Sequence, residues 1–232
     1  MIEYCEEDDL ETMLRRRVLC FIFKKKIIIL YKVWFLIIYS NTSILFLITK
    51  FVSPLLKNFL PEAEAWVYLA HICDGYRALY REGYAHRDLK AKNIFFRRNP
   101  VDASKLIAKV GDYGFIKRLD LQQKDPSHTL LGSTPYMSPE LLTQNSKYDF
   151  KADVWSLGML FYQMLFGRLP FNIDSNSQHI NAVLNCIKRN KLELETPSIK
   201  TSEKAQTLLR SLLNTNAAER MAWEDIFLLL LT

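Results

Sequence analysis

The sequence predicts an α+β fold that is predominantly helical and carries one small β-hairpin. Residues 61–82 and 148–166 place apolar side chains at the three- and four-residue spacing of a buried helix face. Between them, residues 94–96 and 106–110 are short runs of strand-forming side chains separated by turn-forming residues. The hydrophobic content of 49% and the charged content of 24% are ordinary values for a globular domain.

The first predicted helix has start and stop signals, and the second has stop signals. Pro61 suits a first helical turn, and Gly83 suits the position just past a helix end. Gly167 and Pro170 stop the second helix. The apolar stripe of the first helix consists of Trp66, Leu69, Ile72, Tyr76 and Leu79, and that of the second of Val154, Leu157, Phe161, Met164 and Leu165.

Residues 86–93 read His-Arg-Asp-Leu-Lys-Ala-Lys-Asn and resemble the catalytic loop of eukaryotic protein kinases, His-Arg-Asp-Leu-Lys-x-x-Asn. Six fixed residues at fixed spacing arise by chance about once in 10⁸ positions, so the match is specific. The resemblance implies that Asp88 orients an attacking hydroxyl and accepts its proton. It implies that Lys90 neutralises the transferring phosphoryl group and that Asn93 offers an amide oxygen to Mg²⁺. A lysine at position 90 is typical of the serine/threonine kinases.

A second metal ligand follows on the predicted hairpin. Residues 112–114, Asp-Tyr-Gly, resemble the metal-binding Asp-Phe-Gly of the family, with tyrosine in place of phenylalanine. The resemblance implies that Asp112 bridges Mg²⁺ to the phosphates of ATP. Tyr113 keeps a packing ring but adds a hydroxyl that needs a partner.

Residues 115–140 resemble an activation segment, and their end, Gly-Ser-Thr-Pro-Tyr-Met-Ser-Pro-Glu, is close to the family's Gly-Thr-x-x-Tyr-x-Ala-Pro-Glu. By this resemblance Ser133 is a catalytic-site residue that hydrogen-bonds toward Asp88 and Lys90. Ser127 and Thr129 are candidates for phosphorylation, because a loop phosphate would engage the arginine beside the catalytic aspartate. Solvated loop hydroxyls are the equal alternative for these two residues.

Two long-range contacts are also implied by the resemblance. Asp153 is expected to accept backbone N–H groups of the catalytic loop and so to tie the site to the core. Arg220 is expected to pair with Glu140, and removing one partner of such a buried pair would cost several kcal/mol.

Residues 1–17 resemble the kinase hinge and the first helix of the large, C-terminal lobe (C-lobe). Backbone groups at the positions of Glu3 and Cys5 would hold the adenine of ATP. A kinase N-terminal lobe precedes the hinge, and these 232 residues contain neither its Gly-x-Gly-x-x-Gly loop nor its Val-Ala-x-Lys strand. We therefore expect the N-terminal lobe to be missing and this chain by itself to be inactive.

Residues 18–56 contain no Asp, Glu, Gly, Ala, Arg, His, Gln or Met, and three interpretations compete for them. A membrane-spanning helix over residues 27–49 is long enough, but it would place two parts of one lobe on opposite sides of a bilayer. A genuine apolar insertion would be an aggregation hazard unless it were buried. A translated AT-rich intron explains the composition best, since Ala, Gly, Asp and Glu all need codons that begin with G. We expect residues 18–56 to lie outside the fold and residues 57–232 to form a kinase C-lobe.

The composition limits the partners. The net charge of 31 − 25 = +6 comes partly from short basic runs at residues 15–17 and 24–26, which indicates a solvated face and no nucleic-acid partner. The four cysteines are scattered without metal or disulfide spacing, so a reducing, cytoplasmic environment is expected, without membrane association.

The sequence therefore predicts a serine/threonine protein kinase that uses ATP and Mg²⁺ to phosphorylate serine or threonine hydroxyls of a protein substrate. Its expected fold is a protein-kinase-like C-lobe with the β-hairpin at the catalytic site. The alternative is a catalytically silent, kinase-like interaction module. Because Asp88, Lys90, Asn93 and Asp112 are all intact, the sequence favours the enzyme.

Overall fold

The computed structural model describes residues 7–14, 59–119, 133–143 and 148–230. The described α-helices are α3 (Glu62–Arg81), α4 (Pro139–Leu142), α5 (Phe150–Phe166), α6 (Ile180–Arg189), α7 (Glu203–Leu212) and α8 (Trp223–Leu229), and residues 10–14 are also helical. The strands are β1 (Glu7–Asp9), β2 (Tyr84–Ala85), β3 (Ile94–Arg98), β4 (Leu106–Val110), β5 (Lys117–Arg118), β6 (Glu195–Thr196) and β7 (Ile199–Lys200). Single 3₁₀ turns are η2 (Ala91–Asn93), η3 (Tyr113–Phe115), η4 (Thr134–Tyr136) and η5 (Pro170–Asn172).

Helix α3 lies where its start and stop signals predict it. Pro61 occupies the N-cap position, and Glu62 and Glu64 place negative charge at the positive end of the helix dipole. Gly83 has a φ of 76°, a left-handed conformation that glycine adopts without strain. The predicted helix of residues 61–82 is confirmed to within one residue at each end.

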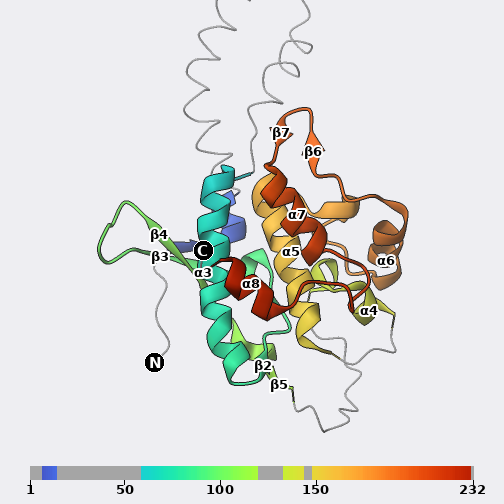
Figure 1. Ribbon diagram of the computed structural model, residues 1–232, viewed down its shortest axis with the longest axis horizontal. Helices are drawn as coiled ribbons and strands as arrows, with labels where there is room; N and C mark the ends of the chain where they lie inside the picture. The colour runs from blue at the N-terminus through green and yellow to red at the C-terminus, as the bar shows by residue number, and fades with distance from the viewer. Residues whose placement is uncertain (1–6, 15–58, 120–132, 144–147, 231–232) are drawn as a thin grey trace, which may run out of the picture.

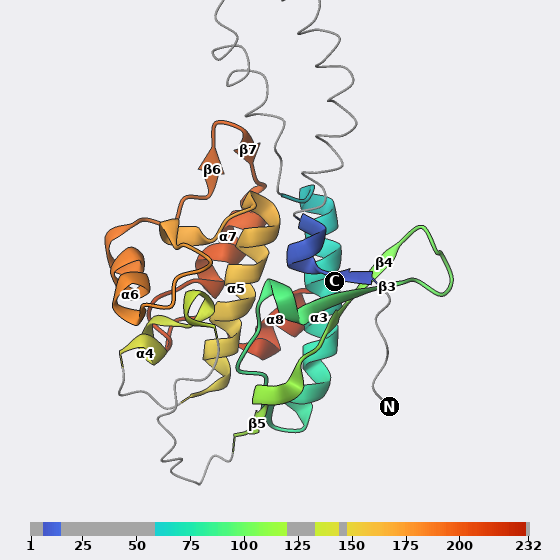
Figure 2. The same cartoon turned by 180° about the vertical axis from the view of Figure 1, so that it is seen from behind.

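Helix α5 is the central element of the described chain. Asp149 caps its first turn by accepting the N–H of Lys151 at 2.5 Å, and Gly167, with a φ of 69°, ends it as predicted. Every residue from Ala152 to Phe166 is buried, because both α3 and α7 pack against α5 (Figures 1 and 2). Gly158 permits close packing against α7, since a Cβ there would lie 2.9 Å from the Leu212 Cβ.

Strands β3 and β4 form an antiparallel hairpin beside α3, with Ile94 opposite Val110 and Arg98 opposite Leu106. Strand β3 is two residues longer than the sequence predicts, since Arg97 and Arg98 belong to the strand and not to its loop. The turn begins at Asn99, whose Oδ1 accepts the N–H of Val101 at 2.9 Å.

The first described segment differs from the prediction. Within residues 1–17, assigned from sequence to the hinge and a helix, Glu7–Asp9 form strand β1, which pairs antiparallel with β3. Three consecutive acidic residues have little strand propensity, so the pairing is imposed by the neighbouring strand. The helix follows at once, and its Leu10 and Leu14 are buried in the main core.

Residues 18–56 lie outside the described part of the chain, so their exclusion from the fold stays a prediction. The same holds for the candidate membrane span over residues 27–49. Among the residues that the structure does describe, no helix is both long and apolar enough to cross a membrane.

The Glu140–Arg220 pair joins α4 to the segment before α8, as the sequence predicts. The guanidinium of Arg220 donates to both carboxylate oxygens of Glu140, at 2.7 and 2.9 Å. Its side chain is 0% exposed, and it also donates to the backbone carbonyls of Lys151 and Asn214. Burial alone would raise the pKa of Glu140, but the hydrogen bonds and charge of Arg220 outweigh it and hold that pKa below its ordinary value.

We expect Glu140→Ala to lower the free energy of unfolding by about 3–5 kcal/mol at pH 7, because it leaves the buried Arg220 cation uncompensated. The matched control is Glu193→Ala. Its pair with Arg168 has the same 2.7 Å contact, but the two side chains are 56% and 38% exposed, so about 0–1 kcal/mol is expected. Urea unfolding measures both free energies, and equal losses in the two variants would contradict this account.

The stability difference between wild type and Glu140→Ala should also depend on pH, because the pKa of Glu140 is lowered in the folded state. The extra free energy of unfolding of the wild type should be present above the unfolded-state pKa and should disappear as the pH falls through the folded-state pKa.

Candidate active site

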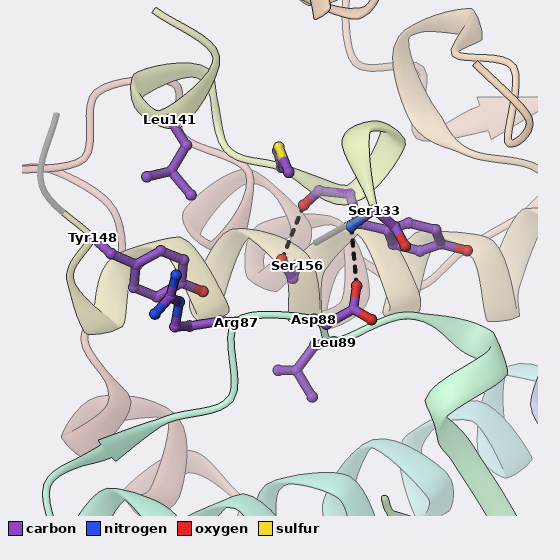
Figure 3. A pocket seen from close by; sticks show the side chains of 9 residues that line it. Arg87, Asp88, Leu89, Ser133, Leu141, Tyr148 and Ser156 are labelled. Carbon is purple, nitrogen blue, oxygen red and sulfur yellow. Dashed lines mark hydrogen bonds between the residues drawn. The ribbon is translucent and has the colours of Figure 1, made fainter. Parts of the chain in front are cut away.

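The predicted catalytic loop, residues 86–93, lies between β2 and β3, and the carboxylate of Asp88 in it is 3% exposed. Asp88 Oδ2 accepts the Lys90 ammonium at 2.6 Å and the Asn93 side-chain N–H at 3.0 Å. Asp88 Oδ1 accepts the backbone N–H of Ser133 at 3.0 Å (Figure 3). A carboxylate has about four acceptor positions, so these contacts leave one position on Oδ1.

Lys90 and Ser133 join the catalytic loop to the end of the predicted activation segment. The Lys90 ammonium donates to the Ser133 hydroxyl at 2.9 Å as well as to Asp88. The hydrogen bonds predicted from Ser133 toward Asp88 and Lys90 are therefore present. Residues far apart in the sequence meet here around one charge pair.

The hairpin brings Asn93 and Asp112 to the same end of β3 and β4. Asn93 precedes β3 and Asp112 follows β4 by two residues, and the N–H of Gly111 donates to the Asn93 backbone carbonyl at 2.9 Å. The Asn93 side-chain nitrogen is already engaged, donating to the carbonyl and the carboxylate of Asp88. This orientation leaves the amide oxygen of Asn93 as its available donor atom toward a cation.

His86 ties the catalytic loop to the segment that carries Asp112. Its Nδ1 accepts the N–H of Asp88 at 3.3 Å, so the ring proton belongs on Nε2, which lies 3.1 Å from the Gly111 carbonyl. The bond from Nε2 to Gly111 links the two stretches that hold Asp88 and Asp112. Strands β2 and β5 pair just outside them and reinforce the same link.

Asp112 and Tyr113 form a local turn after β4. Asp112 has a left-handed backbone with a φ of 60°, is exposed, and its side chain accepts the N–H of Gly114 at 3.4 Å. The Tyr113 hydroxyl finds the partner it requires in the Val110 carbonyl, at 2.7 Å. This bond holds the tyrosine ring back on the strand from which Asp112 emerges.

Asp153, near the start of α5, anchors the catalytic loop as predicted. Its carboxylate is 0% exposed and accepts the backbone N–H groups of His86 at 2.8 Å and Arg87 at 3.0 Å. Two tyrosine hydroxyls, from Tyr76 and Tyr148, also donate to it, each at 2.6 Å. The sequence placed the Tyr76 ring in the core but did not predict the hydrogen bonds of the two hydroxyls to Asp153, since no sequence pattern indicates that these tyrosines contact one carboxylate.

A small pocket opens beside Asp88 and is bounded by the loop that follows Ser133 (Figure 3). Its lining combines charged, hydroxyl and apolar side chains, namely those of Arg87, Asp88, Leu89, Ser133, Tyr136, Met137, Leu141, Tyr148 and Ser156.

Several predicted residues lie outside the described part of the chain. They are the adenine-binding candidates Glu3 and Cys5 and the phosphorylation candidates Ser127 and Thr129. Their roles stay predictions.

The donor set fits Mg²⁺. Asn93 presents an amide oxygen and Asp112 a carboxylate, and both are the hard oxygen ligands that this cation prefers. Among the described residues, no group of three or more His, Cys, Asp or Glu side chains could hold a metal. Two protein ligands suffice for Mg²⁺ only when phosphates and waters complete the coordination, which is its usual condition at nucleotide sites.

The mainly helical fold is consistent with the protein kinase class, and comparison with known proteins shows the family. The protein kinase domain family matches residues 22–228, so the chain belongs to the eukaryotic protein kinase family.

Its relatives include several proteins named serine/threonine-protein kinases. The chain is 35% identical over 168 residues to the serine/threonine-protein kinase ATG1b of Arabidopsis thaliana, covering 72% of this chain and 22% of that protein. It is 35% identical over 168 residues to atg1 of Dictyostelium discoideum (72% and 23%) and 34% identical over 174 residues to ULK1 of Homo sapiens (72% and 16%). The chain thus spans about a fifth of the length of these relatives.

We expect Asn93→Asp to destabilise the chain by about 3–5 kcal/mol at pH 7. It removes two donated hydrogen bonds and places a second carboxylate against that of Asp88 at a buried position. The matched control is Asn99→Asp, because Asn99 accepts hydrogen bonds through its Oδ1 and an aspartate keeps that contact.

The electrostatic part of the loss for Asn93→Asp should shrink as the pH falls from neutral toward about 4, the ordinary pKa of an aspartate, because a carboxyl buried beside another carboxylate takes up a proton at a higher pH than a free one. Thermal unfolding from pH 3 to pH 8 measures this. A pH-independent loss, or an equal loss in Asn99→Asp, would show that the Asn93–Asp88 contact is not the cause.

Proposed function

We propose that this chain is the catalytic lobe of a serine/threonine protein kinase, which transfers the γ-phosphoryl group of ATP to a serine or threonine hydroxyl of a protein. The observation that carries the proposal is the Asp88 carboxylate, which three donors hold in place while one acceptor position on Oδ1 stays available. Such a carboxylate can orient a hydroxyl and accept its proton.

Each side chain has one proposed role. Asp88 orients the substrate hydroxyl and takes its proton as the new oxygen–phosphorus bond forms and the bond to the ADP leaving group breaks. Lys90, held by Asp88 and Ser133, places a compact cation where the transferring group carries negative charge. Asn93 and Asp112 would hold Mg²⁺, which when bound to ATP neutralises the phosphates.

The division of the chain is also a proposal. Residues 57–232 form the C-lobe, and residues 1–17 provide the hinge, with Glu3 and Cys5 contacting the adenine. Burial of Leu10 and Leu14 in the same core as α5 supports the assignment of the first segment to this lobe. Residues 18–56 are proposed to be an insertion outside the fold.

Residues 1–232 by themselves should show little or no phosphoryl transfer. Removing one oriented donor from a transition state lowers the rate by roughly 10²–10³-fold, and these residues contain neither a phosphate-covering glycine loop nor the lysine strand of a kinase. A radiolabelled-ATP assay on a serine peptide tests this. Turnover near 1 s⁻¹, roughly the low end for kinases, would contradict it.

The test of function uses a joined kinase, in which residues 18–56 are removed and the N-terminal lobe of a related kinase precedes the chain. Asp88→Asn keeps the shape but loses the proton acceptor, so kcat and kcat/KM should fall together by more than 10²-fold while Mg²⁺-dependent ATP binding survives. Asp112→Asn replaces an anionic metal ligand with a neutral one, so both nucleotide binding and turnover should weaken.

The matched control is Asp74→Asn, at a side chain that is 79% exposed and lies on α3. It should change neither quantity. The roles are wrong if Asp88→Asn loses Mg²⁺-ATP binding while Asp112→Asn keeps binding and rate. A joined kinase without turnover, despite binding ATP, would instead favour a catalytically silent interaction module.

A further inference from the structure

We propose that Tyr148 is a positioning residue for the catalytic aspartate, an inference that rests on the proposed function. Tyr148 immediately precedes Asp149, the N-cap of α5, and contacts the catalytic loop in two ways. Its hydroxyl donates to Asp153, and its ring lies against the guanidinium of Arg87, 5.4 Å from the Cζ atom to the ring centroid (Figure 3).

The four bonds to Asp153 divide evenly between its two oxygens. Oδ1 accepts the backbone N–H of Arg87 and the hydroxyl of Tyr148. Oδ2 accepts the backbone N–H of His86 and the hydroxyl of Tyr76. Each tyrosine therefore orients one carboxylate oxygen of Asp153, and that oxygen accepts one backbone N–H of the loop. The oxygen that Tyr148 contacts accepts the N–H of Arg87, the residue directly before Asp88.

That peptide has a strained backbone. Arg87 has a φ of 70°, which is uncommon for a residue other than glycine and persists only where surrounding contacts impose it. Tyr148 acts on both ends of Arg87, on its N–H through Asp153 Oδ1 and on its guanidinium through the ring. Since Asp88 follows directly, the direction of its side chain depends on this conformation.

The hydroxyl of Tyr148 is suited to hold a proton and not to transfer it. Burial, and next the charge of Asp153, raise the pKa of Tyr148 well above its ordinary value, and the pKa of Tyr76 is raised for the same two reasons. Both phenols thus remain donors throughout the physiological range. Tyr148 then belongs among the groups that position the reacting carboxylate and does not touch the substrate's reacting atoms.

The test compares Tyr148→Phe, which keeps the ring, with Tyr76→Phe, which removes the equivalent bond on the other oxygen. In the 1–232 chain, amide hydrogen exchange should become about tenfold faster at Arg87 in Tyr148→Phe, as expected for the loss of one hydrogen bond. In Tyr76→Phe the increase should appear at His86 instead. In the joined kinase, Tyr148→Phe should lower kcat about tenfold with little change in the KM for Mg²⁺-ATP.

If Tyr148 only stabilised α5, Tyr148→Phe would instead speed the exchange of all amides together and leave kcat unchanged. Either result overturns the proposal. If Tyr148→Phe does not fold, the hydroxyl proton of Tyr148 in the unmodified chain decides the question by NMR. Slow exchange with water supports the bond to Asp153, and exchange at the rate of a free tyrosine refutes it. Failure of the proposed function would appear separately, as full activity of the joined kinase carrying Asp88→Asn.

Discussion

The buried carboxylate of Asp153 is the constraint on which the site depends. A charge without exposure to water is costly unless hydrogen bonds compensate it, and here two backbone amides and two phenols do so. Because both amides belong to the catalytic loop, satisfying this charge fixes the loop. Asp153 lies on α5, which is buried along almost its whole length. The site is therefore held by a helix that core packing keeps rigid.

The second constraint is the hairpin, which determines what lies opposite the loop. The register of β3 and β4 places Asn93 and Asp112 at the same end of the hairpin. The His86 ring bonds there to the carbonyl of Gly111, the residue directly before Asp112. Loop and hairpin are thereby held together by backbone hydrogen bonds and one imidazole. Of the two proposed metal ligands, Asn93 is buried and Asp112 is exposed.

Patterns local in sequence predicted α3, α5 and the β3–β4 hairpin, and the family resemblance predicted the tertiary contacts of Asp153 and of Glu140 with Arg220. The limits of α3 and the end of α5 followed from helix start and stop signals, and the glycines at 83 and 167 have the left-handed backbones expected of helix ends. Strand β1 was missed because its acidic residues form a strand only by pairing with β3. The sequence motifs placed Asp88 and Ser133 in one site. The hydrogen bond of the Tyr148 hydroxyl could not be predicted, since no residue pattern around Tyr148 in the sequence indicates which carboxylate it contacts.

A crystal structure of the joined kinase with Mg²⁺ and a non-hydrolysable ATP analogue tests the account most directly. It should show the metal bound by the amide oxygen of Asn93 and the carboxylate of Asp112 at roughly 2.0–2.1 Å, with phosphate and water oxygens completing six ligands. Asp88 should keep its contacts with Lys90 and Ser133 and point its remaining acceptor position toward the γ-phosphate. A metal held by other residues, or an Asn93 amide turned so that its nitrogen faces the metal, would contradict the arrangement described here.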